Sequence, residues 1–391
     1  MIFLQAVGSI STLGSSQRKL HDSLRAGTVP GWSVFPDVLP GGKSAPVGAV
    51  AAPLPEIPPG WEKHRSRNNQ LLLAALAQIQ PALDTLQNRV PPHRVGVILG
   101  TSTSGIAEGE TAVAYHAQHG HVPPGYHYQQ QELGDPAICL SAWLGLSGPA
   151  YTISTACSSS ARAFISARRL IHAGVIDAAI VGGADSLCRM TLNGFHSLSA
   201  LSLTGCRPFA ANRDGIVIGE GAALFLLTRE PAPVALLGCG ESSDAHHMSA
   251  PHPDGRGAES ALRQALAEAR LSAADIGYLN LHGTATPQND AMESAAVRRV
   301  FPDGVPCSST KHLTGHTLGA CGAVEAAICH ALLTDDSLPL PAQDFSSAPR
   351  DPNFAALPLV EDRETFLGAK TVLSSNFAFG GNNACLLFGL V

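Results

Sequence analysis

The stretch YTISTACSSSARAFISARRLI at residues 151–171 decides the fold, because a strand pattern becomes a helix pattern within it. Residues 151–154 alternate in polarity, are prone to β structure and follow the breaker Gly148-Pro149. From residue 161 onward the apolar side chains recur at helical spacing instead. The sequence therefore predicts a strand that passes directly into a helix, with Cys157 at the junction.

Cys157 is a candidate nucleophile because of this placement. The hydroxyls of Ser158 to Ser160 are suited to the start of a helix. Free N–H groups and the macrodipole at a helix N-terminus favour a thiolate over a thiol, so we expect the pKa of Cys157 to lie below the usual value of about 8.5. The alternative interpretation is a buried and inert cysteine.

Composition narrows the class of protein. A chain of 391 residues has room for two fused subdomains that share one sheet system. The net charge of -6 gives no support for nucleic-acid binding. Nine cysteines without a CxxC pair argue against a disulfide framework or a zinc cluster, and indicate the reducing cytoplasm. No apolar stretch is long enough for a membrane span, and residues 1–8 are typical of a first strand rather than a signal peptide.

Strand and helix patterns alternate twice along the chain. Strands are expected at 1–8, 95–99, 178–181, 234–237, 276–281, 371–374 and 384–388. Helices are expected at 16–25, 68–80, 260–270, 290–300 and 318–333, with Pro81 ending the second of them and Gly182-Gly183 ending the third strand. We therefore expect two βα-type halves, 1–233 and 234–391, in a layered α/β/α/β/α core.

Two histidine motifs lie in the second half. In NLHGTATP at 280–287, His282 directly follows an apolar strand, so its ring can project from the strand end into a cleft. In STKHLTGHTLG at 309–319, His316 also stands beside a glycine at an element boundary. Lys311 is too far from Glu325 to pair as a helix neighbour, and the two can meet only if the loop folds back.

A fourth motif, NFAFGGNN at 376–383, is an aromatic-glycine turn. Such a turn can present a backbone N–H to an oxyanion while a phenylalanine acts as a movable cover. Each of these motifs alone also has a structural explanation.

In this order along the chain, the four motifs resemble the β-ketoacyl-acyl-carrier-protein synthases, and the resemblance extends to GLSGPAYTIST at 145–155 and ANRDGIVIGEGAA at 211–223. The Cys-His-His set resembles the elongating branch of these condensing enzymes, since the initiating branch has Asn in place of His316. The resemblance implies a five-layered, thiolase-like fold of two similar fused halves, and a dimer. The stretches at 66–79 and 97–105 resemble synthases of aryl-polyene-type pathways.

The resemblance also implies roles for individual residues. Cys157 would hold the acyl chain, and His282 and His316 would donate hydrogen bonds to the malonyl thioester oxygen. The N–H groups of Cys157 and Phe379 would form an oxyanion hole. Lys311 and Glu325 would orient the histidines, Phe379 would act as the gate with Phe377 in support, and Thr284 and Thr286 would contact the phosphopantetheine arm. No metal or bound cofactor is implied, because the substrates ride on an acyl carrier protein.

Other interpretations stay open. Lys63, Arg65 and Arg67 form a basic run that could dock an acidic carrier protein or could simply be a solvated face. The spacings of His116, His119, His121 and His127 fit no zinc pattern well. A Cys-His thioester hydrolase is one alternative function. Another is the catalytic member of a heterodimer with a chain-length-factor-like subunit, in place of a homodimer.

Overall fold

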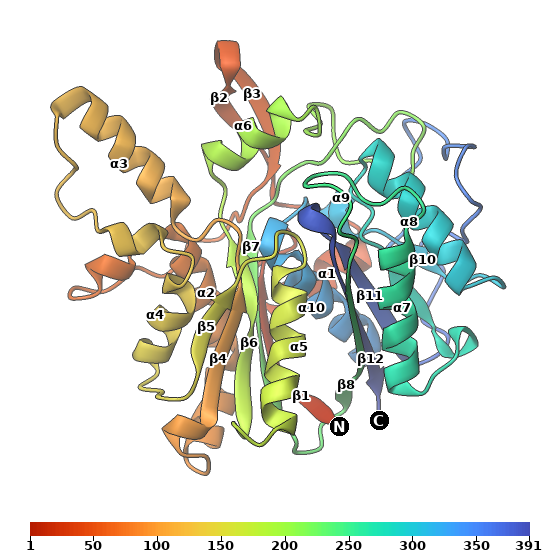
Figure 1. Cartoon of the computed structure of the whole chain (residues 1–391), viewed down its shortest axis with the longest axis horizontal. Coiled ribbons are helices and arrows are strands. Elements are labelled where there is room, and N and C mark those ends of the chain that lie inside the picture. Colours follow the sequence, from red (N-terminus) through yellow and green to blue (C-terminus); the bar gives the residue numbers. More distant parts are fainter.

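The computed structural model describes residues 1–391. One ten-stranded sheet runs through the molecule in the order β10-β9-β11-β12-β8-β1-β7-β6-β4-β5 (Figure 1). Its strands are β1 (Ile2–Ile10), β4 (Val95–Gly100), β5 (Ala150–Ile153), β6 (Ala178–Asp185), β7 (Gly221–Thr228), β8 (Val234–Ser243), β9 (Tyr278–Asn280), β10 (Cys307–Ser308), β11 (Thr371–Phe377) and β12 (Asn382–Leu390). The strand predicted at 151–154 and the seven strands predicted from the alternation are all present, with shifted ends.

The sheet consists of two halves with the same topology, β5-β4-β6-β7-β1 and β10-β9-β11-β12-β8. In each half the first three strands are parallel to one another, and each of the last two strands is antiparallel to the strand before it. Within the sheet, the halves meet at β1 and β8, where Ile2 pairs with Leu236 and Phe3 with Ala235. The repeated order and direction indicate a duplicated unit. We keep 1–233 and 234–391 as the proposed halves, with β8 as the first strand of the second.

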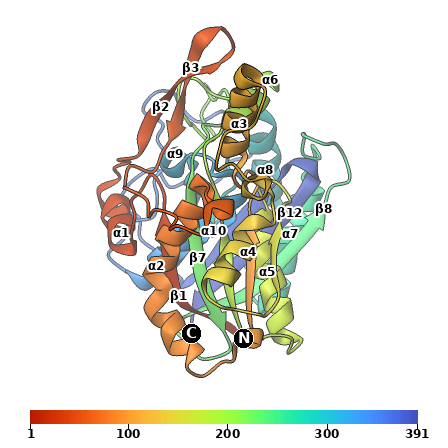
Figure 2. The ribbon, with the colours of Figure 1, turned by 90° about the vertical axis from the view of Figure 1, so that its left-hand side faces the viewer.

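Helices complete five layers. Helices α5 (Ser159–His172) and α10 (Cys321–Thr334) pack against each other between the halves, and their apolar side chains share one core with strands of both. Helices α2 (Arg67–Gln87) and α4 (Asp135–Trp143) cover the outer face of the first half (Figure 2), and α7 (Arg256–Ala269) and α8 (Pro287–Val300) cover that of the second. The predicted α/β/α/β/α fold is therefore confirmed.

The remaining elements lie around this core. They include four helices, α1 (Gln17–Ala26), α3 (Ile106–His119), α6 (Arg189–Ser197) and α9 (Lys311–Thr314). They also include a hairpin formed by β2 (Trp32–Leu39) and β3 (Lys43–Gly48). The hairpin projects from the molecule beside α6 (Figures 1 and 2). None of the helices combines the length and the apolar character needed to span a bilayer.

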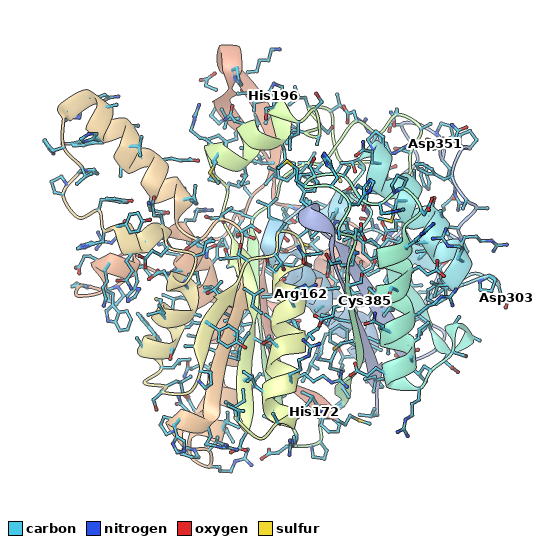
Figure 3. All side chains as sticks on the ribbon, viewed as in Figure 1. Arg162, His172, His196, Asp303, Asp351 and Cys385 are labelled. Atoms are coloured by element: carbon cyan, nitrogen blue, oxygen red, sulfur yellow. The ribbon has the colours of Figure 1, made fainter.

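The two central helices differ in composition. Helix α10 is apolar around nearly its whole circumference, as expected for a helix enclosed by other layers, and Glu325 is its only carboxylate. Helix α5 is amphipathic, and Figure 3 shows Arg162 near its start and His172 at its last residue. Arg162 pairs with Glu241 of β8 at 3.2 Å, so the polar side of α5 faces the opposite half of the sheet.

Two glycines let the start of α5 approach the sheet closely. A Cβ atom on Gly100, at the end of β4, would lie 2.2 Å from the backbone N of Ser160. A Cβ atom on Gly183 would lie 2.4 Å from the carbonyl O of Gly100. Only residues without a side chain fit here. The prediction that Gly182-Gly183 ends its strand is wrong, because β6 runs through both residues to Asp185.

The predicted end of the second helix at Pro81 is also wrong. Helix α2 continues to Gln87 with Pro81 inside it. A proline in a helix interior removes one backbone hydrogen bond. Leu83 and Leu86 beyond it are buried against β-strands, and this burial of apolar surface offsets the loss.

Candidate active site

The candidate residues meet at the carboxyl ends of parallel strands from both halves. Cys157 follows β5, His282 follows β9, and Phe379 follows β11. Lys311 and His316 follow β10 in the link to α10. Ligand sites of α/β sheets characteristically form at this end of the strands. Residues that are more than 100 positions apart in the sequence are thus brought into one cluster.

The turn that carries Cys157 is held in a strained shape by hydrogen bonds. Ala156 has a φ of 51°, a conformation that costs a residue with a side chain roughly 1–3 kcal/mol. The Ser159 hydroxyl donates to the Ala156 carbonyl at 2.5 Å and accepts from the Thr155 N–H at 2.9 Å. Helix α5 begins at Ser159, and Ser158 makes no side-chain cap. The serines therefore brace the nucleophile turn rather than cap the helix as we expected.

The thiol of Cys157 is buried, with 6% of the residue exposed. Burial raises its pKa to about 11, although the positive charge of Lys311 and the backbone N–H groups of Phe379 and Cys157 oppose the rise. The expectation of a lowered pKa is therefore wrong, because loss of water around the sulfur outweighs the helix start. The Nε2 atom of His316, 3.0 Å from the sulfur, is the nearest side-chain partner.

Both histidines are neutral, and their hydrogen bonds fix the tautomer. Burial lowers the pKa of His282 and of His316 well below the ordinary value, and the charge of Lys311 lowers both further. Nδ1 of His316 accepts from the Leu318 N–H at 3.2 Å, and Nδ1 of His282 lies 3.3 Å from the Lys311 ammonium. The protons of both rings consequently sit on Nε2. Each histidine is a neutral hydrogen-bond donor.

Lys311 and Glu325 form a fully buried ion pair, 2.5 Å between Nζ and Oε1. The loop between Lys311 and Glu325 therefore folds back, which was the condition stated for their pairing. The side-chain amide of Asn376 donates to the other carboxylate oxygen at 2.7 Å. Burial alone would lower the pKa of Lys311, but the adjacent Glu325 carboxylate outweighs it and raises the pKa, so the side chain is an ammonium.

Glu293, on α8, contacts the backbone of the His282 motif, which the sequence motifs did not reveal. Its carboxylate accepts from the backbone N–H groups of His282 and Gly283, both at 2.7 Å. Burial raises its pKa to about 7, and these same N–H groups oppose the rise. No spacing rule connects it with the histidine, since helix packing creates the contact. Asn376, by contrast, belongs to the aromatic-glycine motif itself.

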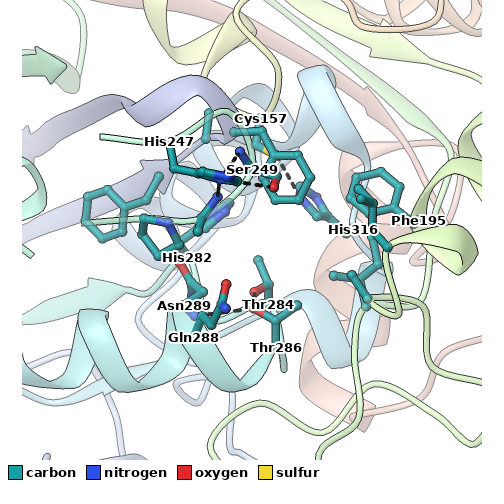
Figure 4. A pocket seen from close by; sticks show the side chains of 18 of the residues that line it. Cys157, Phe195, His247, Ser249, His282, Thr284, Thr286, Gln288, Asn289 and His316 are labelled. Carbon is teal, nitrogen blue, oxygen red and sulfur yellow. Dashed lines mark hydrogen bonds between the residues drawn. The ribbon is translucent and has the colours of Figure 1, made fainter. Parts of the chain in front are cut away.

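The thiol and both histidines line a cavity of about 240 Å³ (Figure 4). Thr284 and Thr286 lie on its wall with their hydroxyl oxygens 2.9 Å apart. The ring of Phe379 is half-buried, and its centroid lies 5.4 Å from that of Phe195. Phe377, which the sequence motifs predicted, also lines the cavity. Further lining residues belong to no predicted motif role, among them Phe195, Leu198, Ile216, His247, Gln288 and Asn289.

The ligand atoms of Cys157, His282 and His316 lie within 4.8 Å of one another, close enough to be tested as a metal site. A metal ion would have to displace the Nε2 protons and sit beside the Lys311 ammonium, so the residues fit proton donation better than metal binding. In the histidine patch His119 and His121 flank Tyr115, and their Nδ1 atoms face backbone carbonyls. That patch does not gather into a ligand set.

The basic run lies away from this cavity. Lys63 and Arg65 are exposed. Arg67 is different, because its guanidinium binds both carboxylate oxygens of the buried Glu220, at 2.7 and 2.5 Å. The charge of Arg67 is therefore compensated within the fold. Arg65 lies 4.0 Å from the Glu62 carboxylate in an exposed contact, so Lys63 and Arg65 are the two charges of the run that face solvent.

Comparison with known proteins matches this geometry. The family description "Beta-ketoacyl synthase, N-terminal domain" fits residues 48–232, and "Beta-ketoacyl synthase, C-terminal domain" fits residues 234–343. The chain belongs to the β-ketoacyl synthase family. It is 32% identical over 336 residues to the 3-oxoacyl-(acyl-carrier-protein) synthase 2 of Staphylococcus aureus, covering 81% of this chain and 82% of that protein. Nodulation protein E of Rhizobium meliloti is 37% identical over a region that makes up 64% of this chain and 65% of that protein's length.

Among solved structures, the similarity to a ketosynthase of Xenorhabdus doucetiae is high. That protein, ApeO, was solved in complex with its chain length factor, ApeC. The chains share 52% sequence identity with a TM-score of 0.97, over 100% of this chain and 98% of the other. The fold and the family that the sequence motifs resembled are therefore confirmed.

Proposed function

We propose that this chain is an elongating β-ketoacyl-acyl-carrier-protein synthase, an acyltransferase that condenses malonyl-carrier with an acyl chain held on Cys157. The observation that carries the proposal is one buried thiol and two neutral imidazoles in a single cavity, backed by the Lys311 ammonium. These groups supply a covalent station and two proton-bearing donors, which a two-step acyl transfer needs.

In the loading step, the Cys157 sulfur attacks the thioester carbonyl of the acyl-carrier. A new carbon–sulfur bond forms, the bond to the carrier sulfur breaks, and the Cys157 proton passes to that leaving sulfur. The Nε2–H of His316, 3.0 Å from the thiol, stabilises the developing thiolate and offsets the burial that disfavours it. The N–H groups of Cys157 and Phe379 hold the oxygen of the tetrahedral intermediate.

In the condensing step, malonyl-carrier loses CO2, and the electron pair of the broken bond forms an enolate. Its oxygen accepts hydrogen bonds from the Nε2–H groups of His282 and His316, whose tautomers are already set by Lys311 and Leu318. The enolate carbon attacks the Cys157 thioester, the carbon–sulfur bond breaks, and the freed thiolate takes a proton from solvent. The β-ketoacyl chain leaves on the carrier.

The cavity fits a narrow, partly polar arm. The hydroxyls of Thr284 and Thr286 offer hydrogen bonds to the amides of phosphopantetheine, while Phe195 and Phe379 form an apolar side. We assign Phe379 as the gate that moves when the acyl chain loads, with Phe377 in support. Thioester hydrolysis is less well supported, because a base must activate water and both Nε2 atoms already carry protons.

The partner we propose is a chain-length-factor-like subunit, as the ketosynthase of X. doucetiae has. Strand β5 is an edge strand with half-exposed residues, next to α4. Exposed apolar side chains lie on and before α4, namely Leu133 and Ile138. An open edge beside apolar surface favours pairing with another chain. A homodimer is the alternative outcome.

The substrate we propose is a polyene-type chain in the cytoplasm, with fatty-acid elongation as the alternative. The stretches at 66–79 and 97–105 and the ApeO relationship support this pathway, and all nine cysteines are free thiols, which suits a reducing compartment. Carrier docking is assigned to Lys63 and Arg65, which face solvent.

The test is a two-stage incubation followed by intact-protein mass measurement. The chain, alone and co-expressed with a chain-length-factor-like protein, receives an acyl-carrier and then malonyl-carrier. We expect the acyl mass on Cys157 first, and then its loss together with CO2 release and a β-ketoacyl-carrier. Release of free acid without any β-ketoacyl product would establish hydrolysis instead.

A further inference from the structure

Cys321, the first residue of α10, is a second buried thiol at the nucleophile, and none of the roles above uses it. Its Sγ atom lies 3.0 Å from the carbonyl oxygen of Cys157 and 3.5 Å from the amide nitrogen of Asn376. Burial raises the pKa of Cys321 well above its ordinary value, so the group keeps its proton and can donate it in a hydrogen bond.

The carbonyl of Cys157 has no other donor. The first hydrogen bonds around the start of α5 go to the carbonyls of Thr155, Ala156 and Ser158, and pass over Cys157. No other side chain reaches that oxygen. A buried carbonyl without a partner is costly, so the thiol of Cys321 fills a need that the local fold leaves open.

The backbone of the nucleophile is thereby fixed on both sides. The peptide before Cys157 is held by the Ser159 hydroxyl, which donates to the Ala156 carbonyl. The peptide after Cys157 is held by Cys321. Without these two hydrogen bonds the strained turn at Ala156 would be free to relax, and the N–H of Cys157 would turn away from the reacting oxygen.

The same thiol connects the nucleophile with the ion pair of the other half. The two amide protons of Asn376 point to the Glu325 carboxylate and to the sulfur of Cys321. Glu325 in turn holds Lys311, which faces His282. A continuous chain of contacts therefore joins the two chemical steps through one sulfur atom.

We propose that Cys321 is a positioning residue that holds the peptide after Cys157, and with it the thiol and the oxyanion-binding N–H, in the reactive geometry. This inference rests on the proposed acyl transfer, and deepens it. Cys321 acts through the backbone of Cys157 and makes no contact with substrate.

The experiment compares Cys321→Ala, which loses the donor, with Cys321→Ser, which keeps a donor at the same place. Cys329→Ala is the matched control, since it removes another fully buried thiol of the same helix that has no contact with Cys157. Single-turnover acylation is measured against acyl-carrier concentration. We expect Cys321→Ala to lower the saturating rate about tenfold with little change in KM, and Cys321→Ser to restore most of it.

A second readout needs no carrier. Iodoacetamide alkylation of Cys157 is followed by peptide mapping between pH 7 and 10. In Cys321→Ala the profile moves to higher pH, with a rate at pH 8 about threefold lower, whereas Cys321→Ser and Cys329→Ala follow the wild type. If Cys321→Ala does not fold, Cys321→Val keeps the volume without the donor.

Equal losses in Cys321→Ala and Cys321→Ser, or no change in either, would overturn the positioning role. A wild-type protein that fails to take up acyl groups would refute the proposed function instead. In that case the alkylation profiles still decide whether Cys321 sets the reactivity of Cys157.

Discussion

The two halves of the molecule share one strand order, yet their equivalent strand-to-helix junctions carry different chemistry. In the first half β5 reaches α5 through a short turn, which holds Cys157 by its own backbone. In the second half β10 reaches α10 through a longer link that contains α9, places His316 on the cavity wall and sets Lys311 against His282. The duplicated unit thus brings Cys157 and His316 together from two equivalent junctions, while His282 comes from the end of the neighbouring strand β9.

The junctions also differ in how they tolerate burial. The first relies on glycines that let α5 approach the sheet, and it carries no charged side chain at the turn. The second encloses an ion pair, whose charges are satisfied by each other and by Asn376. The shape of the first junction therefore depends on backbone geometry, whereas that of the second depends on a buried ion pair. Mutations should therefore separate them.

The largest effect is expected at the first junction. Cys157→Ala removes the covalent station, so acyl transfer should be lost while the fold stays intact. Cys157→Gln should also fail to condense but should still decarboxylate malonyl-carrier, because the amide resembles the thioester carbonyl and both histidines remain. Product analysis and CO2 release distinguish the two. Persistent condensation in either variant would mean that the nucleophile is another residue.

The next effect separates the two histidines. His282→Ala should still form acyl-Cys157 but should lose decarboxylation by about 100- to 1000-fold, since one donor to the enolate is missing. His316→Ala should lose decarboxylation to a similar extent and should also slow acylation about 10- to 100-fold, because its Nε2 lies 3.0 Å from the sulfur. Intact mass and CO2 release are measured in parallel. Equal acylation rates in the two variants would contradict the assigned contact.

Breaking the buried ion pair should cost stability. Lys311→Met leaves the Glu325 carboxylate enclosed without its partner, and we expect the free energy of unfolding to fall by about 3–5 kcal/mol. Urea unfolding measures the change. The double variant Lys311→Met/Glu325→Gln should recover most of it, because no charge then stays buried. A single variant as stable as the wild type would show that the pair is not enclosed as described.

The raised pKa of Cys157 predicts a pH dependence. Only the thiolate reacts with iodoacetamide, and below the pKa its fraction rises about tenfold per pH unit. With a pKa of about 11, alkylation of folded protein should keep rising from pH 7 to 10, whereas the urea-unfolded chain should level off nearer its ordinary value. A plateau between pH 7 and 8 in the folded protein would restore the original expectation of a helix-activated thiolate.

The smallest effect concerns carrier docking. Lys63→Glu with Arg65→Glu should raise the KM for the carrier several-fold and weaken the salt dependence of association, with kcat unchanged. Arg67→Glu is the contrasting variant, because it disrupts the pair with buried Glu220 and should lower stability instead. Kinetics at several ionic strengths and thermal unfolding separate the two. An unchanged salt dependence would mean that Lys63 and Arg65 are only part of a solvated face and do not dock the carrier.

Much of the fold could be read from local patterns. The alternation of strand and helix periods predicted the layers, and the change of period at residues 151–171 located the turn that carries Cys157. The errors came where local rules met packing. Pro81 did not end its helix because Leu83 and Leu86 are buried, and Gly182-Gly183 did not end a strand because the sheet needs residues without side chains there.

By itself, the sequence determined which elements the candidate residues follow, because motif spacing and hydrophobic period are local properties of the chain. Only the tertiary structure decided their electrical state and their neighbours. The raised pKa of Cys157 and the pairing of Arg67 with Glu220 depend on segments that are distant in sequence. The contacts of His282 with Lys311 and with Glu293 join residues that are closer along the chain, but they too are made by the packing of separate elements. Exclusion of water and the approach of such segments are set by packing, and no spacing rule in a single sequence specifies them.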